Sequence, residues 1–423
     1  MALDRRPASG QKIGSLLVDP GGPGASGVDF LPDAVSMMPK SLLDRFDVVG
    51  FDPPGVARTA PVSCLDGTGL QQYYNFDPDP ATPAALAAYV AEDRTFAQGC
   101  RARSGAELPY VSTVDAAMDM DYIRAAVGDA QLNYLGFSYG TFLGATYAQL
   151  YPTRVRAMVL DGATDPALGV LQSDKEQAAS FETDLHDALT ACSNQKSCPR
   201  KPSGDPIQAY QALAQRIRSA PLPVKGSART AGPSSFLYAT AVTLYDTSTW
   251  PDLYQMLASA SRGDGTYMVQ LADAYEGRQD DGTYDNELEA NAAVNCLDSP
   301  SPSLSDIEAA LPSFEAAAPV FGPSVLYSQI QCSYWPVPAT GAPGPIHADG
   351  SPSILVVGST GDPATPYADA QALASELQHG VLLTRVGDGH TAYPYSACIR
   401  TQVDAYLTQL TVPVTGTRCP TDG

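Results

Sequence analysis

The stretch Leu132-Asn-Tyr-Leu-Gly-Phe-Ser-Tyr-Gly-Thr-Phe-Leu-Gly144 decides how this chain folds. Its first six residues form a short apolar run typical of a buried strand, and residues 141–150 carry Ala and Leu at helical spacing. Ser138 therefore stands on a tight turn between a strand and a helix, flanked by Gly136 and Gly140. A G-x-S-x-G motif in this strand–turn–helix context is typical of a nucleophile elbow, so we interpret Ser138 as a nucleophile.

Apolar runs and helical patterns alternate on both sides of this stretch. The expected strands are 13–18, 46–51, 132–137, 155–160, 353–358 and 380–385. The expected helices beside them are 113–127, 141–150 and 395–410. Strands that alternate with helices in this way predict a parallel sheet with helices on both faces.

The strand pattern stops after Asp165 and resumes near Gly350. Helical patterns fill the interval, at 175–191, 206–219, 234–245 and 250–261, with Pro, Gly and Ser clusters between them. We therefore predict a helical cap domain over residues 166–350. It is inserted between the two parts of one sheet domain, residues 1–165 and 351–423.

A serine hydroxyl is a poor nucleophile without a general base beside it. Among four histidines, His390 is the expected base, because its loop Gly387-Asp-Gly-His-Thr391 directly follows a predicted strand. The other three are interpreted as surface residues: His186, His347 and His379.

The acid that orients the histidine is expected after the preceding strand. Asp362, in Gly361-Asp-Pro-Ala-Thr365, holds that place. Three rival carboxylates remain: Asp161, Asp165 and Asp388. The order serine, acid, histidine is that of α/β-hydrolases. We therefore predict an α/β-hydrolase fold, a mostly parallel sheet flanked by helices, with Ser138, Asp362 and His390 as its catalytic triad.

The Gly-rich segment Asp19-Pro-Gly-Gly-Pro-Gly24 follows the first expected strand, where it can supply oxyanion donors. We expect these donors to be the backbone N–H groups of Gly22 and Tyr139, with Gly21 in reserve. Residues 22–27 also match G-x-G-x-x-G, so a dinucleotide-binding oxidoreductase is an alternative. That alternative leaves the serine, the acid and the histidine unexplained.

The composition excludes several classes of protein. A formal net charge of −21 opposes nucleic-acid binding, which needs clustered Lys and Arg. Hydrophobic residues make up 44%, as in a globular chain, and no apolar run reaches the ~20 residues of a membrane-spanning helix. We expect no cofactor and no metal. The four histidines supply few metal ligands, and no C-x-x-C pair is present.

The eight cysteines are better interpreted as disulfides than as free thiols, which indicates an oxidising compartment. Short loops favour neighbours, so the expected pairs are Cys64–Cys100, Cys192–Cys198, Cys296–Cys332 and Cys398–Cys419. The segment Met1-Ala-Leu-Asp-Arg-Arg6 lacks the apolar stretch of a signal peptide. We expect that such a peptide has been removed or that the chain begins late.

Further motifs run through the chain: Asp19-Pro-Gly-Gly-Pro-Gly-Ala-Ser-Gly27, Arg156-Ala-Met-Val-Leu-Asp-Gly162, Val294-Asn-Cys-Leu-Asp298 and Cys332-Ser-Tyr-Trp-Pro336. With the elbow, they resemble the secreted tripeptidyl aminopeptidases, relatives of proline iminopeptidase, over nearly the whole chain. The resemblance implies a serine exopeptidase that removes short peptides, tripeptides above all, from free amino termini outside the cytoplasm. Two features depart from that family: Pro54 replaces a usual arginine, and additional strands before residue 13 are expected to be missing.

An exopeptidase must measure the distance from the chain end to the bond it cleaves. The chain end is an ammonium with a pKa of about 7.7–8, so a fixed carboxylate in the cap is a simple gauge. We expect Asp298, held by a Cys296–Cys332 bridge, to be that carboxylate, with Glu182 and Glu289 as lesser candidates. An ordinary cap of the turn at Ser299 is the other interpretation of Asp298.

The expected partners are therefore peptides with a free amino terminus, and neither nucleic acid nor a membrane. A carboxylesterase of the same fold is the main alternative, since some members of the resembling family act on esters. A binding protein built on an inactive hydrolase scaffold is a third. The sequence does not indicate an oligomeric state.

Overall fold

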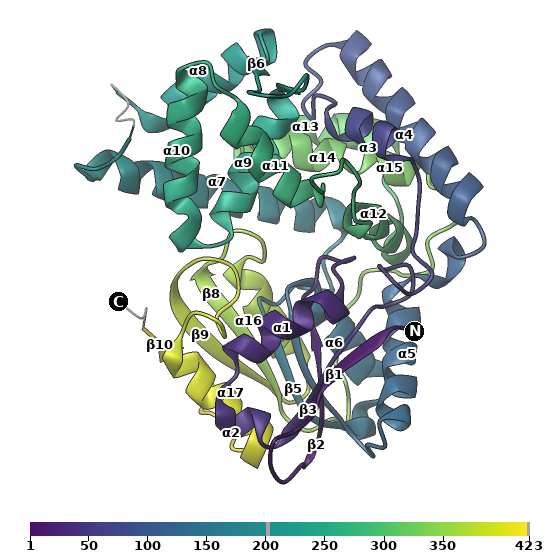
Figure 1. Ribbon diagram of the computed structural model, residues 1–423. Helices are drawn as coiled ribbons and strands as arrows, with labels where there is room; N and C mark the ends of the chain where they lie inside the picture. The colour runs from purple at the N-terminus through teal and green to yellow at the C-terminus, as the bar shows by residue number, and fades with distance from the viewer. Residues whose placement is uncertain (200–203, 421–423) are drawn as a thin grey trace.

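The computed structural model describes residues 1–199 and 204–420, and it places eight strands in one twisted sheet (Figure 1). In spatial order the strands are β1 (Leu3–Arg6), β3 (Phe46–Phe51), β2 (Gly14–Asp19), β4 (Leu132–Phe137), β5 (Val155–Asp161), β8 (Ile354–Gly361), β9 (Gly380–Asp388) and β10 (Thr417–Cys419). Neighbouring strands are parallel except β1, which is antiparallel to β3. The predicted α/β-hydrolase fold is confirmed.

Helices cover both faces of this sheet, which explains why β2, β3 and β4 are mostly apolar and are buried along their whole length. Side chains alternate between the faces. Leu16 packs with α1 (Gly27–Met37) and α17 (Ala397–Gln409). Leu17 packs on the other face, with three helices: α5 (Thr113–Ala126), α6 (Tyr139–Leu150) and α16 (Tyr367–Glu376).

The expectation that no strand precedes residue 13 is wrong, because β1 forms an edge of the sheet. Leu3 lies opposite Phe51 and Arg6 opposite Val48. The side chains of β1 are mostly exposed, so the strand has no apolar pattern by which it could be recognised. Its backbone hydrogen bonds to β3 define it instead.

A second, helical part of the molecule lies above the carboxyl ends of the strands (Figure 1). Its helices from residue 166 onward are α7 (Val170–Asn194), α8 (Pro206–Ser219), α9 (Pro233–Leu244), α10 (Trp250–Ser261), α11 (Thr266–Glu276), α12 (Glu287–Asp298), α13 (Leu304–Ala317), α14 (Gly322–Tyr327) and α15 (Ile330–Ser333). The four helices expected here from the sequence match α7 to α10. Helices α7 to α11 share a core of their own, separate from that of the sheet.

Two helices that precede β4 in the sequence also lie in this helical part: α3 (Gly67–Tyr74) and α4 (Pro83–Ser104) (Figure 1). Phe96 of α4 packs in one cluster with Leu297 and Trp335. We therefore propose that the cap is built from residues 166–350 together with this earlier segment.

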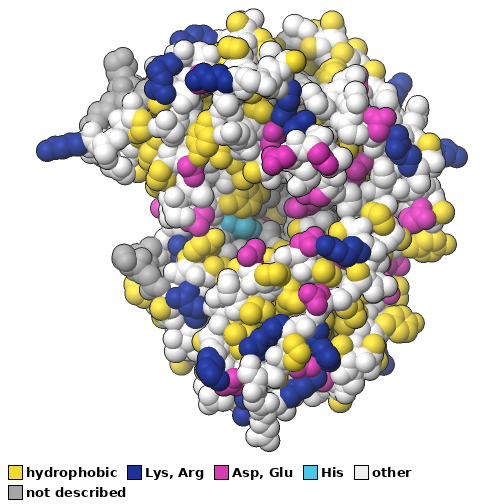
Figure 2. All heavy atoms as spheres, in the orientation of Figure 1, with side chains coloured by type: hydrophobic (Ala, Val, Ile, Leu, Met, Phe, Trp, Pro, Cys, Tyr) yellow, Lys and Arg dark blue, Asp and Glu magenta, His cyan; other side chains and the backbone are white. Residues whose placement is uncertain are grey.

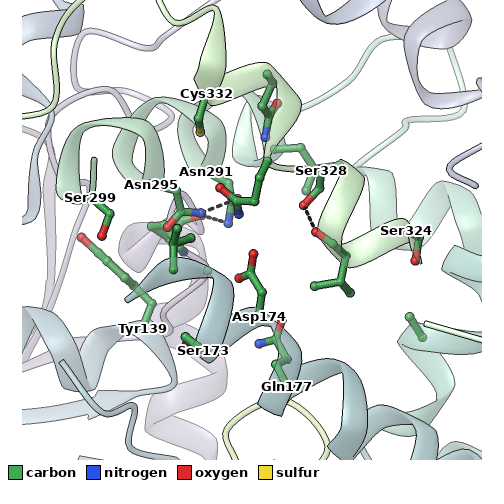
Figure 3. A pocket seen from close by; sticks show the side chains of 18 of the residues that line it. Tyr139, Ser173, Asp174, Gln177, Asn291, Asn295, Ser299, Ser324, Ser328 and Cys332 are labelled. Carbon is green, nitrogen blue, oxygen red and sulfur yellow. Dashed lines mark hydrogen bonds between the residues drawn. The ribbon is translucent and has the colours of Figure 1, made fainter. Parts of the chain in front are cut away.

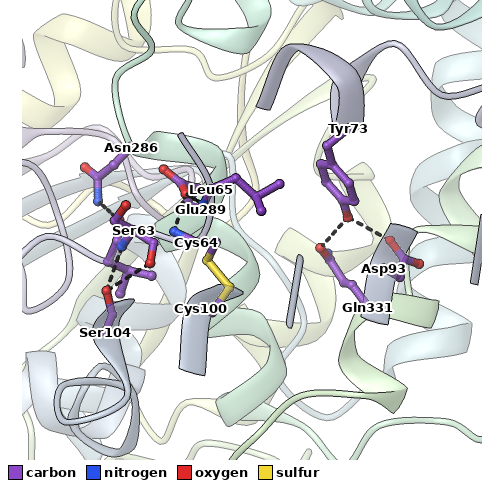
Figure 4. The surroundings of a disulfide bond; sticks show 11 residues. Ser63, Cys64, Leu65, Tyr73, Asp93, Cys100, Ser104, Asn286, Glu289 and Gln331 are labelled. Carbon is purple, nitrogen blue, oxygen red and sulfur yellow. Dashed lines mark hydrogen bonds between the residues drawn. A yellow bond between two sulfur atoms is a disulfide. The ribbon is translucent and has the colours of Figure 1, made fainter. Parts of the chain in front are cut away.

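Four disulfides fasten the loops and helices, in the four pairs expected from the sequence: Cys64–Cys100, Cys192–Cys198, Cys296–Cys332 and Cys398–Cys419. The first ties the loop before α3 to α4. Figure 4 shows Glu289 beside it, where Oε1 accepts hydrogen bonds from the backbone N–H groups of Cys64 (2.5 Å) and Leu65 (3.1 Å). Glu289 thus holds α12 to this loop.

Candidate active site

Ser138 lies in the turn between β4 and α6, with backbone angles of φ 55° and ψ −126°. Such sparsely populated conformations cost of order 1–3 kcal/mol and concentrate at functional sites. The turn closes tightly because residue 136 is glycine: a Cβ there would lie 2.5 Å from the carbonyl oxygen of Gly140. The elbow therefore holds Ser138 at the carboxyl end of the central sheet, on the wall of a cavity.

His390 and Asp362 lie in the loops that follow β9 and β8, and their side chains pair directly. Nδ1 of His390 is 2.8 Å from Oδ1 and 3.0 Å from Oδ2 of Asp362. The carboxylate also accepts hydrogen bonds from the backbone N–H groups of Ala364 (3.0 Å) and Thr391 (3.1 Å). An acceptor at Nδ1 places the proton there and leaves Nε2 free to accept another. Nε2 is buried and has no hydrogen-bond partner among the described residues.

The environment of His390 raises its pKa above the ordinary value of 6.5. Burial acts against the charged imidazolium and lowers the pKa. The charge and hydrogen bond of Asp362, together with the charge of Asp161, outweigh burial and raise it. The imidazole is therefore a stronger base than a free histidine.

Asp161, one of the rival acids, holds the histidine loop in place. Its carboxylate accepts hydrogen bonds from the backbone N–H groups of Ala392 (2.9 Å) and Tyr393 (2.7 Å). Burial raises its pKa to about 6, against the lowering effect of these hydrogen bonds. Its carbonyl oxygen accepts the N–H of Ser138 at 2.9 Å. Asp161 thus links the elbow to the loop that carries His390.

The remaining rivals stand elsewhere in the site. Asp165 accepts the backbone N–H of Ala167 at 2.8 Å, and Asp388 ends β9, where it is half-buried. The three histidines interpreted as surface residues are all exposed: His186, His347 and His379.

Two residues that the sequence analysis missed bring His390 to the cavity that Ser138 lines. Thr365 Oγ1 is 3.3 Å from Nδ1 of His390. The carbonyl oxygen of Tyr245 accepts the backbone N–H of His390 at 2.8 Å, and the two rings meet edge to face with centroids 5.5 Å apart. Thr365, Tyr245 and Ser138 all line one cavity, so two of the residues that contact His390 lie at its wall.

The turn at Gly21 and Gly22 packs against the elbow. Gly21 has φ +100°, and a Cβ on it would lie 2.9 Å from that of Ser138 and 3.0 Å from the backbone nitrogen of Tyr139. Its N–H already donates to Oδ1 of the buried Asp19 at 2.9 Å. Gly22 and Tyr139 line the cavity beside the serine, and Tyr139 begins a helix whose first N–H groups lack helical partners. This arrangement favours Gly22 over Gly21 as an oxyanion donor.

The cavity has a volume of about 490 Å³ and lies between the sheet and the cap. Figure 2 shows the hollow between the two parts, with a histidine at its floor and acidic side chains around it. No Lys or Arg of the described residues lines the cavity. Five carboxylates do: Glu92, Asp93, Asp165, Asp174 and Asp298. Much of the rest is aromatic: Tyr73, Tyr74, Phe76, Tyr89, Phe96, Tyr238 and Tyr275. The cavity can therefore accept a cationic group and apolar side chains together.

The two carboxylates expected to bind substrate are placed differently by the structure. Asp298 lines the cavity, but its oxygens accept hydrogen bonds from the backbone N–H (2.9 Å) and hydroxyl (2.5 Å) of Thr113. Oε2 of Glu182 accepts the backbone N–H groups of Val320 (2.9 Å) and Phe321 (3.3 Å). Glu182 thus holds the segment before α14, and Phe181 beside it lines the cavity instead.

Polar side chains of α7 and α12, missed by the sequence analysis, face each other across the cavity (Figure 3). Asp174 points from α7 into the open space, and its Oδ2 is buried without a hydrogen-bond partner among the described residues. Gln177, one turn further, donates to the carbonyl oxygen of Ala364 at 2.7 Å, within the loop that carries Asp362. On α12, Asn291 donates to the carbonyl oxygen of Pro23 at 3.1 Å. Both cap helices are therefore tied to loops that carry predicted site residues.

Comparisons with known proteins agree with this fold. A family model described as TAP-like protein matches residues 318–419, and one described as alpha/beta hydrolase fold matches residues 14–200. The chain is 35% identical to serine protease Hip1 of Mycobacterium tuberculosis, over 99% of this chain and 83% of the relative. It is 37% identical to carboxylesterase B of the same species (99% and 82%). It is 31% identical to tripeptidyl aminopeptidase of Streptomyces lividans (96% and 77%).

Fold, site and relatives together define a serine hydrolase of the α/β-hydrolase fold. The chain belongs to the TAP-like family of these hydrolases. This membership excludes the dinucleotide-binding alternative. The G-x-G-x-x-G segment of this chain, residues 22–27, packs closely against the cap instead. A Cβ on Gly24 would lie only 2.3 Å from the carbonyl oxygen of Glu287 in α12, so no side chain fits there. None of the described helices combines the length and the apolar character that crossing a membrane requires.

Proposed function

We propose that the protein is a serine exopeptidase that releases short peptides, tripeptides above all, from free amino termini through an acyl-enzyme on Ser138. The observation that carries this proposal is the cavity at Ser138, lined by five carboxylates and, among the described residues, by no Lys or Arg. A peptide amino terminus, with a pKa of about 7.7–8, is mostly cationic at neutral pH. Negatively charged walls favour its entry. Relatives named serine protease and tripeptidyl aminopeptidase support the same choice.

In the proposed reaction the hydroxyl of Ser138 attacks the scissile carbonyl while Nε2 of His390 takes its proton. Asp362 keeps the imidazole oriented and stabilises the imidazolium. The N–H groups of Gly22 and Tyr139 donate to the oxyanion. The imidazolium then returns the proton to the departing amine, and water releases the peptide from the serine by the same steps in reverse order.

Among the cavity carboxylates we assign the ammonium to Asp174. Asp174 and Asp93 each have one oxygen without a partner among the described residues, whereas both oxygens of Asp298 already accept from Thr113. We choose Asp174 over Asp93 because α7, which carries it, is hydrogen-bonded through Gln177 to the loop that carries Asp362. Burial raises the pKa of Asp174 to about 7, against a hydrogen bond from Gln329 that lowers it. A bound ammonium would offset that desolvation cost. Asp298, which the sequence analysis expected to bind the ammonium, is the residue with which Asp174 is compared.

A carboxylesterase is the second candidate, because the chain is 37% identical to a relative named carboxylesterase B. Either enzyme would work outside the cytoplasm: four disulfides are typical of an oxidising compartment, and we propose that the protein is secreted.

Hydrolysis of Ala-Ala-Pro-p-nitroanilide with a free amino end is expected to exceed that of its acetylated form by about 10–100-fold in kcat/KM, as for loss of a charged hydrogen bond. Steady-state rates, with p-nitrophenyl butyrate alongside, give the comparison. Asp174→Asn should bring the two peptide rates together by raising KM for the free peptide. Asp187→Asn removes the same charge from an exposed site on α7 and serves as control. Equal rates in the wild type, with faster butyrate hydrolysis, would favour the esterase.

A further inference from the structure

We propose that Asp298 is a positioning residue, which acts from the cap through Thr113 on the side chain of Tyr139, the residue next to the nucleophile. This role belongs to the same serine-hydrolase site, and it rests only on the acyl-enzyme part of the proposed function. Its basis is a chain of three side chains from three elements: the end of α12, the start of α5 and the start of α6.

The hydrogen bonds in this chain have a defined direction. The Thr113 hydroxyl lies 2.5 Å from Oδ2 of Asp298 and 2.5 Å from the hydroxyl oxygen of Tyr139. A threonine hydroxyl has one proton, and a carboxylate can only accept. Thr113 therefore donates to Asp298 and accepts from Tyr139. Burial, together with the charge of Asp298, raises the pKa of Tyr139 well above its usual value, so that the phenol keeps the proton it donates.

The carboxylate end of this chain is fixed by the backbone around it. Oδ1 of Asp298 accepts the N–H of Thr113, the first residue of α5, where the helix dipole favours a negative charge. The preceding residue, Leu297, accepts N–H groups from Thr340 (2.8 Å) and Gly341 (2.9 Å) through its carbonyl oxygen. The disulfide from Cys296 then ties α12 to α15. Asp298 is therefore fixed by contacts of its own side chain and of the two residues before it.

The tyrosine end of the chain adjoins the proposed nucleophile in the sequence and lines the same cavity. Tyr139 follows Ser138, begins α6, and its backbone N–H is the proposed oxyanion donor beside that of Gly22. A side chain pinned at its hydroxyl limits how far the first turn of α6 can rotate. Small displacements of oxyanion donors lower the rate strongly, because these donors must be placed precisely. The structure thus couples correct seating of the cap to the geometry of the elbow.

We call the hydrogen-bonded chain from Asp298 through Thr113 to Tyr139 the relay. Breaking it is expected to lower kcat for all substrates alike. Tyr139→Phe and Thr113→Val each remove one hydroxyl, and each is expected to lower kcat about tenfold for both p-nitrophenyl butyrate and Ala-Ala-Pro-p-nitroanilide, with little change in KM. Because both break the same chain, the double variant should be no slower than either single one. Thr113→Ser keeps a hydroxyl and should recover most of the rate. Tyr122→Phe, at an exposed tyrosine of α5, is the matched control.

Active-site titration with a fluorophosphonate counts the folded enzyme in each preparation, so that a poorly folding variant does not mimic a slow one. Additive losses in the double variant would overturn the relay. So would an Asp298→Asn variant that raises KM for the free peptide alone, since Asp298 would then bind the ammonium itself. The butyrate measurements test the relay even if the wild type cleaves no peptide, in which case only the exopeptidase proposal fails.

Discussion

Replacement of Ser138 by alanine is expected to abolish acyl-enzyme formation and to lower kcat by about 10⁶-fold, the scale of nucleophile loss in serine proteases. The elbow would keep its fold, because alanine retains the Cβ and the hydrogen bond from the backbone N–H to Asp161. A fluorophosphonate probe, read by intact mass, should add one adduct to the wild type and none to the variant.

Ser375→Ala provides the matched control, since Ser375 is an exposed serine at the end of α16. It should accept the probe at the wild-type rate. An adduct that persists in Ser138→Ala would assign the nucleophile to another residue and remove the basis of the proposed mechanism.

Replacement of His390 by alanine is expected to lower kcat by about 10⁴–10⁶-fold, because the serine then loses its general base.

The pH dependence of kcat/KM in the wild type is expected to report the titration of this base. The imidazole must be neutral to accept the proton, so kcat/KM should fall as the pH drops through the pKa of His390. Since that pKa is raised, the midpoint should lie above pH 6.5.

Asp362→Asn separates the two effects of the acid. Removing the charge and the hydrogen bond takes away the contributions that raise the pKa of His390, so the midpoint should move to lower pH. The rate at the plateau should also fall, by about 10⁴-fold, because an amide no longer enforces the productive tautomer. A midpoint unchanged in Asp362→Asn would show that another group governs the profile.

The residues of the proposed triad could be predicted from the sequence because each lies next to a strand that is itself recognisable. Ser138 follows an apolar run and precedes a helix. Asp362 and His390 follow the last two central strands, and parallel strands bring their carboxyl ends to one edge of the sheet.

The cap could not be predicted to the same depth. Helical patterns define its helices, but nothing in them fixes how α7, α12 and the earlier α4 meet around a cavity. The role of a carboxylate there depends on its neighbours in space. Glu182 lies in a cap helix as expected, yet backbone N–H groups of the segment before α14 occupy its oxygen. Asp174 lies in the same helix and keeps an oxygen without a partner among the described residues.

The proposed nucleophile and the proposed recognition of a free amino terminus are tested together by covalent modification with a tripeptide diphenyl phosphonate of Ala-Ala-Pro type, prepared with a free and with an acetylated amino end. We expect a single adduct that peptide mapping assigns to Ser138, formed about 10–100-fold faster by the free form, since the same ammonium contact operates in the inhibitor. Modification at another residue would contradict the assignment of the nucleophile. Equal rates for the two forms at Ser138 would contradict an enzyme that recognises the free amino terminus.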